Sequence, residues 1–217
     1  MGVSPDDPTA AGRPGVHGSR RTYEGDGVAV EWDPTLCIHT ARCIAAQPAV
    51  FDPARRPWVD LAAASPEDVA DAVRRCPTGA LQLREETAPP PEPAVEVRPD
   101  GPLFVRGDVT VAGRTGHRFA LCRCGATGNA PFCDNSHKAI GFRARDNARD
   151  ELSGASPAGP VEVRVPDRPG PYRVRGARVV TPSGDVLADA EECVLCRCGR
   201  SARKPFCDGS HRDHPQA

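Results

Sequence analysis

The residues of this chain that are best suited to chemistry are cysteines and histidines that occur twice in the same order. The first set is Cys122, Cys124, Cys133 and His137, and the second set follows 74 residues later as Cys196, Cys198, Cys207 and His211. Both copies obey the pattern C-x-C-x2-[ST]-x3-P-x-C-D-[GN]-S-H. Three thiolates and one imidazole suit zinc or an iron–sulfur cluster. The sequence therefore predicts one four-ligand metal site twice.

The spacing within each copy bears on the choice between these metals. Two cysteines one residue apart, such as Cys122 and Cys124, can bind one iron. Cys133 and His137 can reach a second iron from a turn that leads into a helix. A zinc finger more often has two C-x2-4-C or H-x3-5-H pairs, although the ligand set alone permits a structural Cys3His zinc site.

Other positions also agree between the copies. Thr127 and Ser201 are expected to donate hydroxyl hydrogen bonds to sulfur, and Pro131 and Pro205 fix the backbone before the third ligand. These roles support the ligands without binding metal.

The turn after the third cysteine has its own requirements. Asp134 and Asp208 are expected to cap the following helix or brace its backbone. Asn135 stands where the second copy has Gly209, and both residue types suit a positive backbone dihedral.

This pattern resembles the CDGSH iron–sulfur domain, the mitoNEET-like or NEET group. The resemblance implies a [2Fe–2S] cluster held by three cysteines and one histidine in each copy: Cys122, Cys124, Cys133 and His137, then Cys196, Cys198, Cys207 and His211. Single-copy relatives pair two chains, so two copies in one chain are expected to pack around a pseudo-two-fold axis within a monomer.

Three earlier cysteines suggest a third cluster. Cys37-Ile-His-Thr-Ala-Arg-Cys43, followed by Cys76-Pro77, matches a reduced form of the bacterial ferredoxin run C-x2-C-x2-C-x3-C-P. Thr40 and Gln47 replace the other two cysteines, so at most one cluster is expected. The region resembles the divergent 4Fe–4S mono-cluster domain.

The type of this third cluster stays open. Three thiolates suit a [3Fe–4S] cluster, or a [4Fe–4S] cluster with a fourth ligand from His39, water or a partner. The alternative is that Cys37, Cys43 and Cys76 are ordinary small buried residues.

The elements that position the first three cysteines form a small α+β, ferredoxin-like module over residues 26–84. Strands are predicted at Val28–Trp32 and Ala80–Leu83. Between them we expect a short helix carrying Cys37 and Cys43, and a second helix from Pro66 to Arg75 whose N-cap is Ser65. Residues 1–25 lack apolar periodicity and are expected to be disordered.

The repeated ligands lie in two small β-rich modules, at 94–145 and 161–217, after a Pro-rich linker at 85–93. A polar linker at 146–160 separates them. The predicted strands correspond between the copies: Val95–Arg98 and Leu103–Gly107, then Val161–Arg164 and Tyr172–Gly176.

Composition limits the class of protein. Hydrophobic residues make up 39% of the chain and aromatic residues 5%, so its small units need metal staples. The N-terminus has no signal-peptide core and no run is apolar enough to span a membrane, which predicts reduced thiols in the cytoplasm. A net charge of −1 gives no reason to expect nucleic acid or a membrane as a partner.

The remaining cysteine and histidine residues are expected to be structural or solvated. Cys193 has no counterpart in the first copy and is expected to be structural, and His17, His117 and His214 are expected to be solvated. Phosphate loops and nucleophile elbows are absent from the sequence, so a catalytic site is not expected.

The predicted function is electron transfer, with the N-terminal cluster and two [2Fe–2S] clusters forming a relay between a reductase and an acceptor. The alternatives are a carrier that donates clusters to apo iron–sulfur proteins, or a redox and pH sensor, and a structural zinc protein. The histidine ligands suggest that acid loosens the clusters, because a protonated imidazole cannot bind metal.

Overall fold

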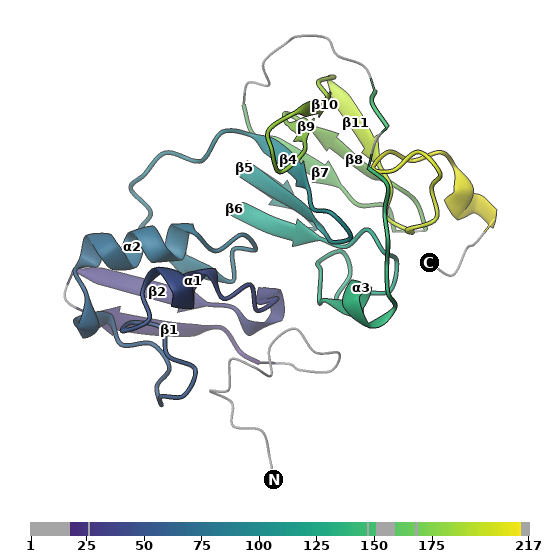
Figure 1. Cartoon of the computed structure of the whole chain (residues 1–217). Coiled ribbons are helices and arrows are strands. Elements are labelled where there is room, and N and C mark those ends of the chain that lie inside the picture. The colour runs from purple at the N-terminus through teal and green to yellow at the C-terminus, as the bar shows by residue number, and fades with distance from the viewer. Residues whose placement is uncertain (1–17, 26, 147, 151–158, 168, 214–217) are drawn as a thin grey trace. The chain divides into compact units, whose positions relative to one another are not determined.

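The computed structural model describes residues 18–25, 27–146, 148–150, 159–167 and 169–213. The chain divides into two compact units, with the boundary between Pro89 and Pro90 (Figure 1). The expectations for residues 1–17, His17 and His214 lie outside the described residues. None of the described helices is long and apolar enough to cross a membrane.

The first unit contains a three-stranded antiparallel sheet in the order β1 (Arg21–Gly25), β2 (Val28–Trp32), β3 (Leu81–Leu83). The last two strands confirm the prediction. The expectation of disorder through residue 25 is wrong for Arg21–Gly25, because all five residues pair with β2 and Tyr23 packs edge-on against Trp58.

The helices of this unit differ in how well the sequence predicted them. The helix α2 (Pro66–Arg74) begins as expected, because the Ser65 hydroxyl accepts a hydrogen bond from the Asp68 amide at 3.2 Å. Its buried face, formed by Val69, Ala72 and Val73, packs into a core built around Trp32, Phe51 and Trp58.

The predicted short helix is wrong at its start. The helix α1 (Arg42–Ala46) contains Cys43, but Cys37 precedes it in a loop that follows a 3₁₀ helix at Pro34–Leu36. His39 and Ala41 have φ values of 52° and 56°, and these left-handed conformations stop a helix from extending back to Cys37.

The second unit is built on one eight-stranded sheet with two short helical segments, α3 (Ser136–Ala139) and a 3₁₀ helix at Ser210–Asp213. The strands are β4 (Ala94–Val97), β5 (Leu103–Val111), β6 (Arg114–Leu121), β7 (Val161–Arg164), β8 (Tyr172–Arg175), β9 (Arg178–Val180), β10 (Val186–Ala188) and β11 (Glu192–Leu195). Their order is β10-β9-β4-β5-β7-β8-β11, with β6 paired to β5. Strands dominate and helices are short, which is compatible with an α+β class.

The two sequence copies exchange strands within this sheet. Strand β4 pairs antiparallel with β5 of its own copy and parallel with β9 of the other. Strand β7 does the same, antiparallel with β8 and parallel with the second half of β5. The predicted β-rich modules thus form one unit with an internal two-fold relationship, and Val95, Val105, Val163 and Val174 are all buried in it.

Candidate metal centres

Each repeated cysteine loop begins where a strand ends. Strand β6 runs directly into Cys122, and β11 runs directly into Cys196. The chain then turns back, so that Cys133 donates its amide to the Ala120 carbonyl at 2.9 Å and Cys207 donates to the Val194 carbonyl at 2.9 Å. These bonds place the third ligand of each copy beside the first.

The eight predicted ligands come together as four pairs. The Sγ atoms are 3.6 Å apart in Cys122 and Cys124, and 3.9 Å apart in Cys196 and Cys198. The sulfur of the third cysteine lies 3.5 Å from Nδ1 of His137 in the first copy, and 3.4 Å from Nδ1 of His211 in the second. Two ligands of one tetrahedral metal with bonds of about 2.3 Å lie about 3.8 Å apart, so each pair fits one metal ion.

The pairs do not merge into single-ion sites. Within the described part of the chain, no three Cys, His, Asp or Glu side chains gather closely enough to hold one metal ion. A mononuclear zinc site needs four ligands around one point, whereas a two-iron cluster needs two separate pairs. The donor arrangement therefore fits a [2Fe–2S] cluster better than zinc. We call the two arrangements site 1 (Cys122, Cys124, Cys133, His137) and site 2 (Cys196, Cys198, Cys207, His211).

The hydroxyls of Thr127 and Ser201 have a different role from the one predicted. Each donates to a carbonyl, that of Phe132 at 2.7 Å and that of Phe206 at 2.6 Å. The backbone N–H groups of the same two residues donate to the sulfur of the first cysteine in each copy. The prediction found the right residues but assigned the sulfur contact to the wrong atoms.

The aspartates brace the ligand turn as predicted. Asp134 accepts hydrogen bonds from the amides of Ser136 at 2.9 Å and Gly128 at 2.8 Å. Burial raises the pKa of Asp134, but hydrogen bonds from the Ser136 hydroxyl and from the two amides outweigh burial, and the net pKa is below its usual value. Asp208 makes the same two contacts, with Ser210 and Ala202.

The residue after each aspartate has the positive φ that the sequence predicted, 74° at Asn135 and 93° at Gly209. This conformation turns the backbone amide toward the third ligand. The amide of Asn135 lies 3.5 Å from the Cys133 sulfur, and that of Gly209 lies 3.4 Å from the Cys207 sulfur. Such N–H contacts stabilise a thiolate.

The protonation of the site 1 ligands follows from their contacts. A hydrogen bond from Cys124 lowers the pKa of Cys122 to about 6, and the same contact raises the pKa of Cys124. Burial raises the pKa of Cys133 to about 12. Burial, followed by the charge of Lys138, lowers the pKa of His137 and keeps its imidazole in the neutral form that binds metal.

The two cysteine loops touch each other through their glycines. A Cβ atom at Gly125 would lie 2.7 Å from the Cys198 carbonyl oxygen, and one at Gly199 would lie 2.7 Å from the Cys124 carbonyl oxygen. Only glycine fits this close approach, and both residues also have a positive φ. The internal two-fold relationship therefore brings site 1 and site 2 into adjacent positions.

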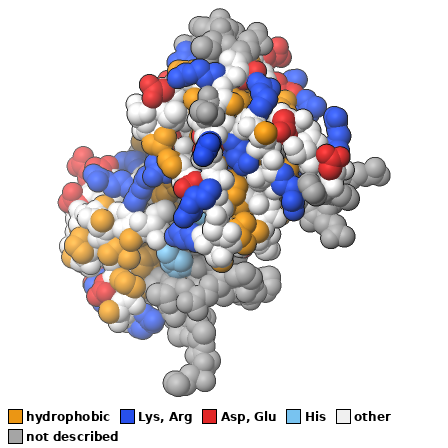
Figure 2. Space-filling view, turned by 45° about the vertical axis from the view of Figure 1, so that its right-hand side comes forward, with side chains coloured by type: hydrophobic (Ala, Val, Ile, Leu, Met, Phe, Trp, Pro, Cys, Tyr) orange, Lys and Arg blue, Asp and Glu red, His pale blue; other side chains and the backbone are white. Residues whose placement is uncertain are grey.

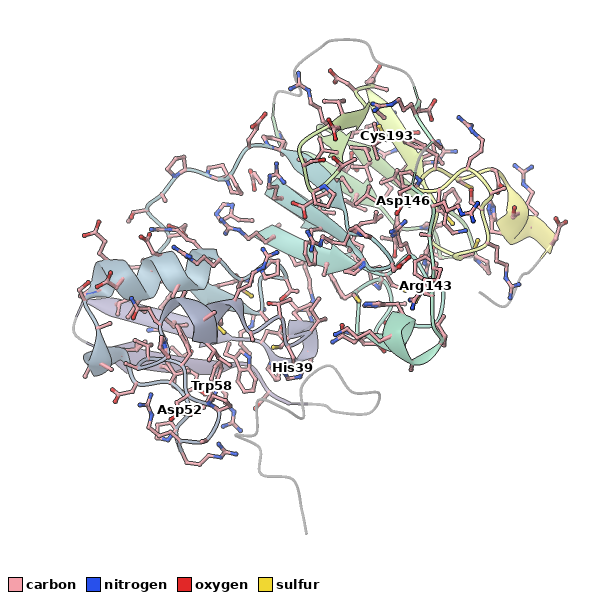
Figure 3. The ribbon with its side chains drawn as sticks, viewed as in Figure 1. His39, Asp52, Trp58, Arg143, Asp146 and Cys193 are labelled. Carbon is pink, nitrogen blue, oxygen red and sulfur yellow. The ribbon has the colours of Figure 1, made fainter. Side chains whose placement is uncertain are left out.

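Two residues that sequence reasoning missed support site 1. The Tyr172 hydroxyl, from β8 in the second copy, donates to the Cys122 carbonyl at 2.7 Å. Arg123 is 2% exposed and forms a bidentate ion pair with Asp146 at 2.5 and 2.9 Å; Asp146 is labelled in Figure 3. The corresponding Arg197 is partly exposed and makes a 3.3 Å hydrogen bond to the Pro166 carbonyl.

In the first unit, Cys37, Cys43 and Cys76 line one cavity of about 80 Å³. His39, labelled in Figure 3, lines the same cavity. Burial raises the pKa of Cys37 to about 12 and that of Cys43 to about 11. Buried thiols of this kind ionise when a cation binds to them.

One indole group of this cavity supports an anionic occupant. Nε1 of Trp32 and Nε1 of Trp58 are buried and meet no hydrogen-bond acceptor with normal geometry among the described residues, but Trp58 lies close enough to the Tyr23 hydroxyl to lower the pKa of Tyr23 in part. Trp32 nevertheless lies close enough to Cys37 to lower that pKa in part. A buried N–H without an acceptor costs free energy, and the sulfur atoms of a cluster are suitable acceptors. The cavity therefore fits an iron–sulfur cluster held by the three cysteines.

Comparison with known families agrees with these assignments. The divergent 4Fe-4S mono-cluster family matches residues 23–86, and the family described as iron-binding zinc finger CDGSH type matches residues 100–138 and 169–212. The chain carries a mono-cluster domain and two CDGSH segments. Both families bind iron, which supports iron–sulfur clusters in both units.

Relatives add little about function. Two proteins named "Uncharacterized protein YjdI", from Escherichia coli strain K12 and from Escherichia coli O157:H7, are each 28% identical to the chain over 71 residues. The match covers 33% of this chain and 93% of each relative. No solved structure matches the chain, so the ferredoxin-like fold of residues 26–84 stays a prediction.

The other candidate residues stand apart from these centres. Cys193 is 3% exposed on β11, opposite Val174 of β8, as its structural interpretation requires (Figure 3). His117 is half-buried, and its Nδ1 lies 3.3 Å from the Gly107 carbonyl, so the expectation that it is simply solvated is wrong.

Proposed function

We propose that this chain is an electron-transfer protein with a [2Fe–2S] cluster in each CDGSH segment and a [3Fe–4S] or [4Fe–4S] cluster in its mono-cluster domain. The observation that carries the proposal is the arrangement of donors in pairs, 3.4 to 3.9 Å apart, at both repeated sites. A bound cluster supplies reversible one-electron chemistry. The surrounding N–H groups hold the sulfur ligands in place and stabilise their negative charge.

The histidine in each site sets its electronic character. Neutral imidazole in place of a thiolate makes the site less negative by one charge, which raises its reduction potential as histidine ligation does in Rieske centres. Buried His137 stays neutral because burial lowers its pKa. The CDGSH segments are thus suited to accept electrons from a donor with a lower potential.

The contact between the two cysteine loops favours exchange of electrons between site 1 and site 2. The Gly125 and Gly199 loops pack backbone against backbone, so no side chain separates them at this point. The mono-cluster domain is tethered to the CDGSH unit, which keeps its cluster at a high effective concentration near the other two. Together these features support a relay within one chain.

The first test is the content of iron, zinc and acid-labile sulfide per chain in protein purified without oxygen, with visible and EPR spectra. We expect about seven or eight iron atoms with matching sulfide, and a signal that appears on reduction and disappears on reoxidation without loss of iron. About four iron atoms would leave only the CDGSH clusters. Zinc without sulfide would overturn the proposal in favour of a structural zinc protein.

The relay has its own test. Cys37→Ser removes a proposed ligand of the mono-cluster domain, and we expect slower passage of electrons from a reductase through the chain to an acceptor. Cys193→Ala is the matched control, because it removes a buried cysteine outside the three centres. Equal rates for Cys37→Ser and the wild type would contradict the relay.

A second candidate function is transfer of clusters to apo-proteins. It is favoured by the half-buried state of Cys207 and His211, whose counterparts Cys133 and His137 are only 4% and 8% exposed. A ligand pair that reaches solvent is open to exchange with another protein. Mixing the loaded chain with an apo-ferredoxin distinguishes the functions, because a carrier transfers iron whereas an electron carrier retains it.

A further inference from the structure

The two repeated sites have matching ligands but different surroundings. Four cationic residues lie between or directly after the ligands of site 2. In the first copy, three of the corresponding residues are uncharged and the fourth is a lysine. We call the four cationic residues of site 2 the basic collar: Arg200, Arg203, Lys204 and Arg212. Their counterparts 74 residues earlier are Ala126, Asn129, Ala130 and Lys138. Apart from Arg123 and Arg197, which correspond to each other, the motif of site 2 therefore has four cations where that of site 1 has one.

The collar faces solvent. Arg200, Arg203 and Arg212 are exposed, and none of them forms an ion pair with a described residue. Lys204 is partly exposed and donates to the Ser201 carbonyl at 2.5 Å. Figure 2 shows Lys and Arg side chains at the surface of the protein. The collar charges are thus available to an external partner.

The collar also lies next to the accessible ligands of site 2. Arg200, Arg203 and Lys204 belong to the loop between Cys198 and Cys207, and Arg212 directly follows His211. The Arg212 guanidinium lies within 3.7 Å of the position that a Cβ on Gly209 would take, over the turn between the two ligands. Two acidic residues lie in or beside this segment: Asp208, whose carboxylate accepts the Ser210 and Ala202 amides, and the exposed Asp213, which directly follows Arg212.

Site 1 has the opposite character. Its Cys133 and His137 are buried, and the charge of Arg123 is neutralised by Asp146 beneath the surface. Lys138 is the single exposed cation of the corresponding segment. Cys124 is the partly exposed ligand of site 1, so a partner that approaches the repeated sites meets an accessible Cys–His pair beside several cations only at site 2.

We propose that the basic collar makes site 2 the docking port for an acidic electron-transfer protein of the ferredoxin type, and that site 1 exchanges electrons only through site 2. This inference rests on the proposed electron-transfer function. In the encounter, the reduced partner gives up one electron and site 2 takes it up, with no transfer of atoms. Complementary charge speeds the encounter by steering, and the gain falls as salt screens it.

A protein fits the collar better than a nucleic acid. The chain as a whole has a net charge of −1, and the collar is confined to one loop and one short turn. Binding of single-stranded nucleic acid uses exposed aromatic side chains for stacking, but Phe206, the aromatic residue of this segment, is 1% exposed. An acidic protein surface needs only complementary charge around the site.

The test exchanges the collar between the copies. In the collar-loss variant, Arg200→Ala, Arg203→Asn and Lys204→Ala install the residues of the first copy. In the collar-gain variant, Ala126→Arg, Asn129→Arg and Ala130→Lys install those of the second. Each replacement is already tolerated at the corresponding position of the other copy. Iron, sulfide and far-UV spectra establish that the variants load their clusters.

The probe is a reduced, acidic plant-type [2Fe–2S] ferredoxin, and reduction of the CDGSH sites is followed by rapid-freeze EPR. For the wild type we expect a rate that falls about tenfold or more between low and physiological salt, as steered encounters do. Collar loss should lower the low-salt rate about tenfold and remove most of its salt dependence. Collar gain should raise the rate.

Two further measurements distinguish a failure of the docking port from a failure of the electron-transfer function. A photoreduced neutral flavin should reduce wild type and collar-loss protein at equal rates, and reduction by the flavin but not by ferredoxin would overturn the docking port alone. Failure of both reductants would overturn the electron-transfer function. Equal ferredoxin rates in all variants, or competition by an oligonucleotide at physiological salt, would also overturn the port. If collar loss prevents loading, the collar-gain variant decides the question.

Discussion

The hydroxyl of Tyr172 donates a 2.7 Å hydrogen bond to the carbonyl oxygen of Cys122, and it also lies 3.1 Å from the Pro131 carbonyl. Tyr172 belongs to the second copy, whereas both carbonyls belong to the first. The residue that corresponds to Tyr172 in the first copy is Leu103, which has no hydroxyl to offer. Site 1 is therefore braced from the other copy in a way that site 2 is not.

Tyr172→Phe should weaken site 1 and leave site 2 unchanged. The substitution keeps the ring but removes this donor from the Cys122 carbonyl in a fully buried position, which costs about 1–3 kcal/mol of unfolding free energy, whereas the Pro131 carbonyl keeps its hydrogen bond from the Cys122 amide. The midpoint of chemical denaturation should fall, and about half of the CDGSH visible band should be lost faster than in the wild type. Tyr23→Phe is the control, since it removes the other tyrosine hydroxyl from the first unit. Uniform loss of the whole band would argue against a site-specific brace.

Gly125→Ala and Gly199→Ala should each disturb both repeated sites. The new methyl group would meet the carbonyl of the opposite loop at 2.7 Å, so the loops must separate. Gly113→Ala is a matched control, because Gly113 also has a positive φ, 74°, but has no atom within 4 Å of the new methyl group. The control should cost only the left-handed strain of about 1–2 kcal/mol. Iron content measures the difference, and equal losses in all three variants would show that the loop contact is unimportant.

Acid should release the clusters in two phases. Protonation of the metal-binding nitrogen prevents an imidazole from binding metal. Burial lowers the pKa of His137, which means that its neutral form persists to lower pH and that site 1 should survive after site 2 is lost. The visible absorbance, followed from neutral to acid pH, measures both phases. His211→Cys should slow the first phase, His137→Cys the second, and the double variant both. Unchanged kinetics in the double variant would contradict the role of histidine.

Asp134→Asn should lower stability at neutral pH and flatten its acid dependence. The pKa of Asp134 is lowered in the folded protein, so its stabilisation is present above the unfolded pKa of about 4 and is lost as the pH falls through the folded value. Hydrogen bonds to the carboxylate make a loss on the order of 1–3 kcal/mol reasonable at pH 7. Denaturation midpoints at several pH values measure it. Asp108→Asn, on an exposed position of β5, should change little.

The sequence predicted which cysteines and histidines lie side by side, because both copies have them at one fixed offset; that they bind metal stays a prediction. It also predicted the αL turn at Asn135 and the Ser65 cap, since both depend on residues that lie next to each other in the chain. The Cys37 loop was not predictable in the same way, because nothing about His39 or Ala41 requires a left-handed conformation. That conformation is imposed by the loop around the cysteine cavity.

The features missed at the repeated sites arise from contacts between distant segments. Tyr172 reaches Cys122 across 50 residues, and Arg123 reaches Asp146 across 23. Neither of these partners could be predicted from the local sequence pattern. The sequence also could not predict the exchange of strands between the copies, because the residues of β4 and β7 do not indicate which strand each of them pairs with. The basic collar, in contrast, is visible when the two copies are aligned.

The exchange of strands has a consequence for how the protein is made. Strand β4 needs β9, and the second half of β5 needs β7, so the sheet under site 1 is incomplete until the ribosome has released residues as far as Val180. Long-range parallel pairing of this kind forms slowly. Insertion of iron and sulfide at Cys122 is therefore expected to follow synthesis of the second copy. Maturation of the two sites becomes a single late event on the finished chain.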